Sequence, residues 1–287
     1  MAAANPPVIR APRKTTASRL LLSAVTALVL FFLAAPIFVV LPLSLSSGEL
    51  LVLPTPGYSL RWYQDFFTSS RWLSATYNSI FVAIATTILA TTLGTLAAIG
   101  ITIGSFRGKA VLLAALSLPM VTPVIVTAIA MYFALSLVGL GSTLTGLVLA
   151  HTVLAVPYVL LTVLASLQSF DPTLLRAAAS LGANPIVSFR RIVLPLIAPG
   201  VATGALFAFA TSFDELIVAL FIASPAQFTL PRQMYAGLRE FLSPTIAAAA
   251  VLLIVVSTLL LAMHEFIRAR AAARDAGTPK RTGERNV

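Results

Sequence analysis

Six long apolar segments constrain this chain more than any other feature. A helix needs roughly 20 mostly apolar residues to cross the hydrocarbon core of a bilayer. Only 10% of the residues are charged and the mean hydropathy is +0.98, whereas soluble domains carry about 25% charged residues. The sequence therefore predicts an all-α membrane protein with six transmembrane helices, at approximately Leu20–Leu43, Ser74–Ile103, Ala110–Leu137, Leu144–Leu167, Val193–Ala223 and Ile246–Ile267.

The net charge of +10 follows the predicted topology and gives no reason to expect a nucleic-acid partner. Six spans place both termini on one side of the membrane. Cytoplasmic loops carry an excess of Lys and Arg, so we expect this side to be cytoplasmic. It holds 15 of the 19 basic residues, namely Arg10, Arg13, Lys14, Arg19, Arg107, Lys109, Arg176, Arg190, Arg191, Arg268, Arg270, Arg274, Lys280, Arg281 and Arg285.

A polar, basic stretch joins the fourth and fifth spans and carries local helix signals. Asp171 is a good N-cap, and Pro172 suits the first turn, where its missing N–H costs nothing. Gly182 stands where a left-handed residue would end the helix. Asn184 followed by Pro185 repeats the start signal, which predicts a second short helix running towards residue 192.

The first of these short helices has one narrow face of small and apolar side chains. Its members recur at helical spacing and are Leu174, Ala177, Ala178 and Leu181. A short amphipathic helix at a membrane surface is suited to a groove on another protein. The alternative is a positively charged loop that only orients the two neighbouring spans.

Two acidic residues, Asp214 and Glu215, lie well inside the fifth apolar segment. A charge at the bilayer centre costs roughly 2.5–3.5 kcal/mol on insertion scales, and no Lys or Arg lies inside another span to pair with them. They should face a watery cavity, lie near the outer interface, or bind a cationic ligand. Adjacent side chains on a helix point about 100° apart, so we place Asp214, which shares a face with Phe207, on the pathway. The alternative for Glu215 is a cap or anchor at the outer end of the helix.

Catalytic chemistry has little support in the sequence. His151 lies inside the fourth span, where a lone histidine is usually hydrogen-bonded to a neighbouring helix, and the chain has no cysteine. We therefore assign no metal, no cofactor and no catalytic residue. The nearest approach to a phosphate-binding GxxxxGK[ST] loop, residues 104–110, has the wrong spacing, so ATP hydrolysis is expected in a separate subunit.

The stretch between the fourth and fifth spans resembles the coupling loop of ABC importer permeases. Ala177 and Ala178, then Gly182, then Ile192-x-Leu194-Pro195 match its E-A-A-x3-G-x9-I-x-L-P pattern. Arg176 stands where that family has Glu, which leaves a salt bridge from this position open. The resemblance implies that Asp171, Leu174, Arg176, Ala177, Ala178, Leu181 and Gly182 couple the permease to an ATPase.

A second stretch resembles the spermidine/putrescine importer permeases. It comprises Ser212-Phe213-Asp214-Glu215 and Thr229-Leu230-Pro231, followed by Met234-Tyr235. The resemblance implies a type I ABC importer permease fold in a bacterial inner membrane. Expected partners are a second permease subunit, two cytoplasmic ATP-binding subunits and an external solute-binding protein. The implied substrate pathway contains Thr211, Phe213, Asp214, Glu215 and Tyr235.

Other functions and solutes remain open from the sequence. A permease for a sugar, an anion or iron is one alternative, and a channel, a secondary transporter or a membrane enzyme is a less favoured one. We divide the chain into a basic tail at 1–18, a permease domain at 19–270 with the coupling loop at 171–192, and a basic tail at 271–287. Two short helices are expected on the outer side, one within 44–72 and one bracketed by Pro225, Pro231 and Pro244.

Overall fold

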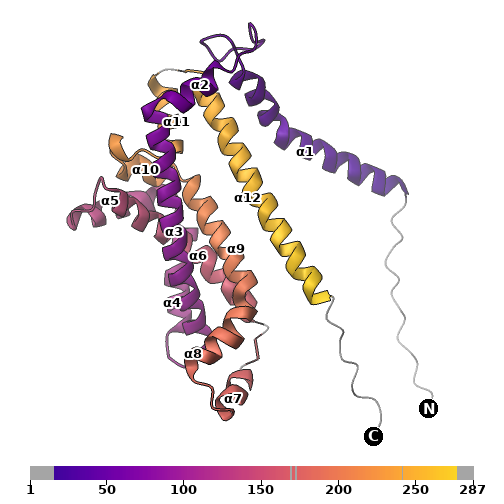
Figure 1. Cartoon of the computed structure of the whole chain (residues 1–287), viewed down its shortest axis with the longest axis vertical. Coiled ribbons are helices and arrows are strands. Elements are labelled where there is room, and N and C mark those ends of the chain that lie inside the picture. Colours follow the sequence, from indigo (N-terminus) through magenta and orange to yellow (C-terminus); the bar gives the residue numbers. More distant parts are fainter. Residues whose placement is uncertain (1–15, 169, 172, 241, 277–287) are drawn as a thin grey trace.

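The computed structural model describes residues 16–168, 170–171, 173–240 and 242–276, and confirms the all-α prediction. Within this part the only strand-like pairing is a single bridge between Ser46 and Tyr58. Most of the two predicted basic tails lies outside the described residues. Five helices are long and apolar enough to span a membrane: α1 (Thr16–Ser44), α3 (Ser70–Ile103), α6 (Leu144–Leu167), α12 (Thr245–Ala276) and the continuous helix Pro185–Phe213 (Figure 1).

The third predicted span is not one straight helix. It consists of α4 (Lys109–Val121) and α5 (Val124–Leu137), which are bent by 108° at the intervening break. Thr122, between the two helices, is extended, with ψ 136°. Its successor Pro123 has no N–H to donate and disfavours the helical conformation in the residue before it. The number of spans reaches six only if this bent pair counts as one.

The fifth predicted span begins earlier and ends earlier than expected. Asn184 does start a helix, α8 (Pro185–Ser188). Contrary to the prediction, however, this is not a separate short helix. It continues through a π-helical turn, η1 (Phe189–Val193), into α9 (Leu194–Phe213). The chain then leaves the helix at Asp214 and starts the short α10 (Ile217–Ile222), so the two acidic residues lie in a break and not on a continuous helix.

The core of the bundle is formed by α3, α6 and α9, and α4 packs against α6. Close approach of these helices depends on glycine, as is common in lipid. A Cβ on Gly204 of α9 would lie 2.9 Å from the Val159 Cα of α6, and one on Gly94 of α3 would lie 2.7 Å from the Val159 Cβ. Gly100 of α3 differs, because a Cβ there would meet nothing within 4 Å.

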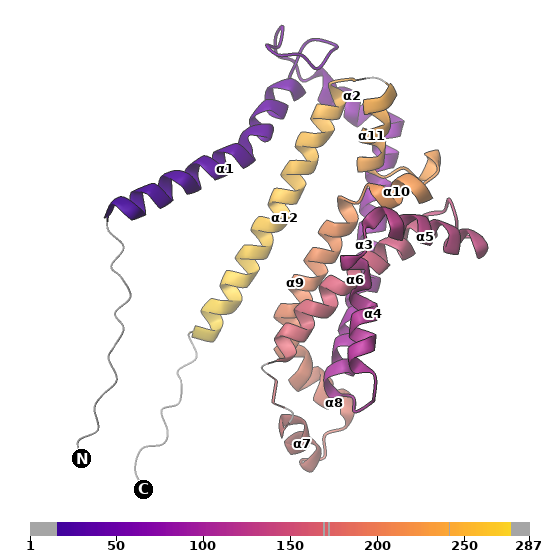
Figure 2. The same ribbon diagram turned by 180° about the vertical axis from the view of Figure 1, so that it is seen from behind.

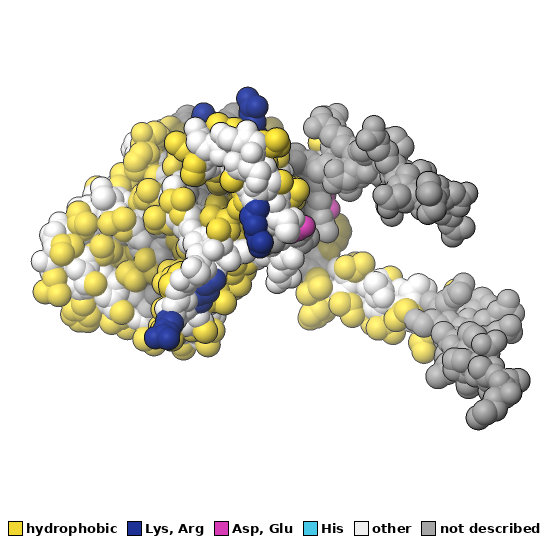
Figure 3. Space-filling model, turned by 90° about the horizontal axis from the view of Figure 1, so that it is seen from below, with side chains coloured by type: hydrophobic (Ala, Val, Ile, Leu, Met, Phe, Trp, Pro, Cys, Tyr) yellow, Lys and Arg dark blue, Asp and Glu magenta, His cyan; other side chains and the backbone are white. Residues whose placement is uncertain are grey.

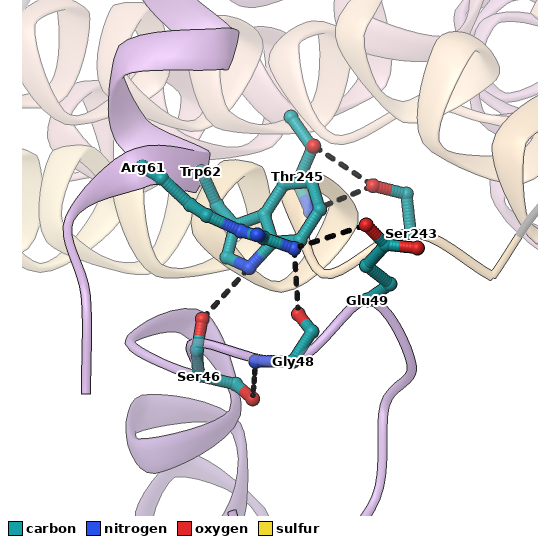
Figure 4. A network of polar contacts seen from close by, with 7 residues as sticks. All are labelled: Ser46, Gly48, Glu49, Arg61, Trp62, Ser243 and Thr245. Carbon is teal, nitrogen blue, oxygen red and sulfur yellow. Dashed lines mark hydrogen bonds and ion pairs between the residues drawn. The ribbon is translucent and has the colours of Figure 1, made fainter. Parts of the chain in front are cut away.

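The end of the bundle that the charge pattern predicts to face outward, called the outer end from here on, carries the two expected short helices, α2 (Arg61–Thr68) and α11 (Leu230–Glu240), with the turn η2 (Pro225–Gln227) before α11. A polar network holds the loop between α1 and α2 in place (Figure 4). The Arg61 guanidinium donates to the Gly48 carbonyl at 3.2 Å, and the Trp62 indole N–H donates to the Ser46 carbonyl at 2.8 Å. The Thr245 hydroxyl donates to Asp65 at 2.7 Å, which ties the start of α12 to α2.

The helices alternate in direction, so α7 (Thr173–Ser180) and the adjoining ends of α3, α4 and α6 lie at the end opposite α2 and α11. α1 lies beside α12 and away from α3, α6 and α9 in both ribbon views (Figures 1 and 2). Seen from below, dark blue Lys and Arg side chains are scattered among yellow hydrophobic ones (Figure 3).

Candidate functional site

The helix α7 has the ends that its sequence predicts. The Thr173 N–H donates to the Asp171 carboxylate at 2.9 Å, and hydrogen bonds from the Thr173 side chain and backbone lower the pKa of the Asp171 carboxyl. At the other end Gly182 is left-handed, with φ 80°. The Ala183 N–H returns to the Ala178 carbonyl at 3.0 Å, which closes the helix C-terminus in the usual glycine-dependent way.

The apolar face of α7 is divided differently from the prediction. Ala178 is buried against the bundle, whereas Ala177 is exposed, and the side chains of Leu174 and Leu181 are 42% and 89% exposed. The reason is that Ala178 lies one residue, or about 100°, from Ala177 around the helix. Leu174, Ala177 and Leu181 thus form an outward apolar strip. Arg176 and Gly182 are exposed as well.

The inner side of α7 faces a cavity of about 410 Å³ between this helix and the bundle. Its wall is almost wholly apolar and comes from α3, α7, the following link, α8 and η1. The wall residues are Ile99, Ile103, Leu175, Ala179, Ala183, Pro185, Ser188, Phe189 and Val193. α7 is therefore not packed solidly into the bundle. After a short link, the chain continues from α7 into the long helix that runs from α8 into α9.

The two helices that flank α7 in the chain, α6 and α9, are joined near the outer end by a buried polar contact. His151 Nδ1 of α6 lies 2.9 Å from Ser212 Oγ of α9, and both side chains are buried. This confirms the expectation of a histidine bonded to a neighbouring helix. Lower down, a Cβ on Gly200 would lie 2.7 Å from the Thr162 carbonyl oxygen, so these helices touch backbone to backbone.

The acidic break follows immediately after Ser212 and Phe213. The Asp214 N–H still donates to the Ala210 carbonyl at 3.1 Å, so Asp214 caps the end of α9. The Glu215 carboxylate accepts the Val218 N–H at 2.8 Å and thereby starts α10. Glu215 is thus a cap, as one reading of the sequence held, but it caps the next helix and not the outer end of a long one.

Asp214 lines a cavity of about 400 Å³ between α9 and α12. Its carboxylate has no ion pair in the described part of the chain. The rest of the wall is apolar apart from two hydroxyls on α12. The wall residues are Leu206, Ala210, Phe213, Asp214, Leu253, Ile254, Ser257, Thr258, Leu260 and Leu261.

The other residues expected on the pathway are not all gathered at this cavity. Phe213 lines it and stacks on Phe209, with ring centroids 5.5 Å apart. Thr211 is half-buried and does not line it. Tyr235 lies on α11 at the outer surface, with the Arg239 guanidinium 5.6 Å from its ring centroid. Sequence reasoning missed Ser257 and Thr258, whose signal is an adjacent hydroxyl pair inside an apolar run.

The Thr229-Leu230-Pro231 motif forms a structural joint on the outer side. The Leu230 N–H donates to Ser79 Oγ at 2.7 Å, and the Asn78 amide donates to the Ala226 and Phe228 carbonyls, both at 3.1 Å. These bonds hold the segment between α10 and α11 against α3. Beside the joint is an open cavity of about 570 Å³ with a mixed polar and apolar wall, which includes Arg71 and Gln233.

The fold is that of a class of membrane transport subunit. Residues 90–272 match the family described as binding-protein-dependent transport system inner membrane component. The chain belongs to this family, whose members are the membrane-spanning permease subunits of ABC importers. It is a permease of the inner membrane and not itself a catalytic subunit.

Relatives place the chain more closely within the family. It is 32% identical over 211 residues to the spermidine/putrescine transport system permease protein PotC of Haemophilus influenzae, which covers 74% of this chain and 82% of that protein. It is 31% identical over 259 residues to the putrescine transport system permease protein PotI of Escherichia coli K12, and the match covers 87% of this chain and 88% of that protein. A bacterial ABC transporter involved in alginate import has the same fold, with a TM-score of 0.67, 16% identity, and 88% of this chain and 96% of that chain covered.

Proposed function

We propose that this permease carries a polyamine of the putrescine or spermidine type into the cell. The observation that supports the proposal most directly is Asp214, an accessible carboxylate in an otherwise nearly apolar cavity between two membrane helices. A polyamine combines ammonium groups with methylene stems, so it matches both a carboxylate and an apolar wall. The relatives named for spermidine and putrescine transport favour the same solute class.

The proposed assembly has a second permease chain, identical or homologous, two cytoplasmic ATP-binding subunits and an external solute-binding protein. The outward strip of α7 docks on an ATP-binding subunit, where ATP is hydrolysed. Both termini and α7 then lie in the cytoplasm. Displacement of α7 is passed through the continuous helix Pro185–Phe213 to the acidic break, where the solute passes in an alternating-access cycle.

The class of solute is tested by measuring uptake with the Asp214→Asn variant, in a reconstituted assembly that includes the solute-binding protein. Uptake of putrescine should fall by roughly tenfold, because a carboxylate–ammonium contact of one to two hydrogen bonds is lost. Glu49→Gln removes a carboxylate that is exposed on the outer loop and should leave uptake unchanged. A wild-type assembly that carries a sugar or an anion but no polyamine would refute the proposed solute.

The coupling role is tested by Leu181→Asp. Because this side chain is 89% exposed, the change should leave the permease folded while it abolishes co-purification of the ATP-binding subunit. Leu50→Asp is the control, since Leu50 is 65% exposed in the loop between α1 and α2, outside the spans and far from α7. ATP-binding subunits that remain bound to the Leu181→Asp permease, or solute flux without any ATP-binding subunit, would contradict this part and favour a channel or secondary carrier.

A further inference from the structure

Two hydroxyls line the Asp214 cavity, and nothing in the described part of the chain bonds to them. Ser257 and Thr258 are adjacent on α12 and both line the cavity, and within the described residues neither side-chain hydroxyl takes part in a hydrogen bond. Several membrane-helix hydroxyls bond back to the preceding turn, whereas Thr91 and Thr95 of α3 do not. Thr87, for example, donates to the Ala83 carbonyl at 2.6 Å, and Thr152 donates to the Val148 carbonyl at 2.7 Å.

An unpaired hydroxyl in an apolar setting is unfavourable unless something bonds to it, and back-bonding is the usual local solution. At Ser257 and Thr258 both oxygens stay available to whatever enters the cavity. A hydroxyl oxygen has two lone pairs and can accept from an ammonium group, which has three N–H donors. The pair is therefore suited to a second cationic group of a ligand whose first is held by Asp214.

Apolar side chains of the wall lie one helical turn from each of these polar groups along its own helix. On α9, Leu206, Ala210 and Asp214 follow each other at intervals of four residues, with the carboxylate at the outer end. α12 runs from the outer end inward, and its hydroxyl pair comes one turn after Leu253 and Ile254. One turn of helix rises about 5.4 Å, so an apolar wall adjoins both the carboxylate and the hydroxyls.

The geometry points to a diamine site: Asp214 pairs with one ammonium group, the leucines of α9 and α12 pack on the methylene stem, and Ser257 and Thr258 accept hydrogen bonds from the other amine. This inference rests on the proposed function and adds the residues that set its selectivity. The site prefers solutes with two amino groups on a flexible alkyl chain over monoamines of equal length. The preference is roughly tenfold, the effect of one hydrogen bond to a charged group.

A single introduced thiol tests the site directly, because the chain contains no cysteine. Thr258→Cys is made in an otherwise cysteine-free assembly and treated with cationic and anionic methanethiosulfonate reagents. The cationic reagent should react faster, and Asp214→Asn in the same background should remove the difference. Putrescine should slow the labelling, and butylamine should slow it roughly tenfold less effectively.

Thr68→Cys is the control, since Thr68 is exposed on α2 at the outer end and its hydroxyl bonds to the Gln64 carbonyl. Its labelling should not respond to Asp214→Asn or to putrescine. A thiol at position 258 that neither reagent reaches would overturn the inference, because the cavity would then be filled by protein. Labelling without charge preference, or equal protection by the monoamine and the diamine, would overturn it too.

Uptake separates this inference from the proposed function. Ser257→Ala combined with Thr258→Val keeps the side-chain volumes nearly constant, and it should lower putrescine uptake roughly tenfold while the melting temperature stays unchanged. Wild-type uptake by this double variant, in an assembly that does carry putrescine, overturns the role of the hydroxyls alone. An assembly that carries no polyamine at all overturns the proposed function as well.

Discussion

Substitution of Gly204 by alanine should destabilise the permease, whereas the same substitution at Gly100 should not. The new Cβ at Gly204 would lie 2.9 Å from the Val159 Cα and 2.6 Å from Thr162 Oγ1. The first neighbour is backbone, so ordinary contact at 3.4 Å requires α6 and α9 to separate by about 0.5 Å. Overpacking of this kind costs about 1–3 kcal/mol, and a backbone clash belongs in the upper part of that range.

Alanine gains about 1 kcal/mol over glycine in helix propensity, so Gly204→Ala should lower the free energy of unfolding by about 1–2 kcal/mol. At Gly100 no atom opposes the new Cβ within 4 Å, and only the gain of about 1 kcal/mol remains. Thermal or denaturant unfolding of the purified permease in one detergent should move the two variants in opposite directions. Equal shifts, or a more stable Gly204→Ala variant, would refute the argument that glycine sets the α6–α9 distance.

Two further predictions concern the polar contacts at the two ends of the same helices. Removal of Asp171 by Asp171→Ala should reduce the hydrogen-exchange protection of the α7 amides. In the native chain this cap should act fully above the pKa of a free aspartate, about 3.9, and should be lost as pH falls through the lower folded pKa. The neutral Asn184 cap of α8, whose Oδ1 accepts the Val187 N–H at 2.8 Å, provides a pH-independent comparison, and equal acid sensitivity of α7 and α8 would contradict the assignment. Ser212→Ala leaves the buried His151 without its interhelical partner and should lower the free energy of unfolding by about 1–3 kcal/mol, measured as for Gly204→Ala; an unchanged value would mean that this contact contributes nothing to stability.

Local chemistry explains which parts of the fold the sequence could predict. Asp171 and Gly182 mark the ends of α7 through hydrogen bonds and backbone angles within a few residues, so the helix was predictable. The break at Asp214 could not be predicted, because apolar residues continue on both sides of it. At this break the Val218 N–H donates to the Glu215 carboxylate and not to a backbone carbonyl, and the apolar pattern of the sequence shows no trace of that change.

Tertiary packing explains the rest of the differences. Gly100 and Gly204 look alike in sequence, and only the position of α6 decides which of them lies against a neighbouring backbone. Ala178 turns inward because the bundle lies on that side of α7, a fact that the helical period alone does not contain. Ser257 and Thr258 acquire a functional interpretation only because α12 places them in the cavity that Asp214 also lines.

Helix α7, for which we propose the coupling role, and the acidic break adjoin opposite ends of the pair formed by α6 and α9. These helices flank α7 in the chain, touch backbone to backbone at Gly200 and Gly204, and are bonded through His151 and Ser212 immediately before Asp214. A change in their separation should therefore alter ATPase coupling and solute passage together. Leu181→Asp should instead abolish association with the ATP-binding subunit, and uptake with it, while Asp214→Asn should weaken uptake and leave that association intact, since each changes an exposed group at one end. If Gly204→Ala impaired one activity and left the other at its wild-type level, α6 and α9 would not transmit motion as a unit.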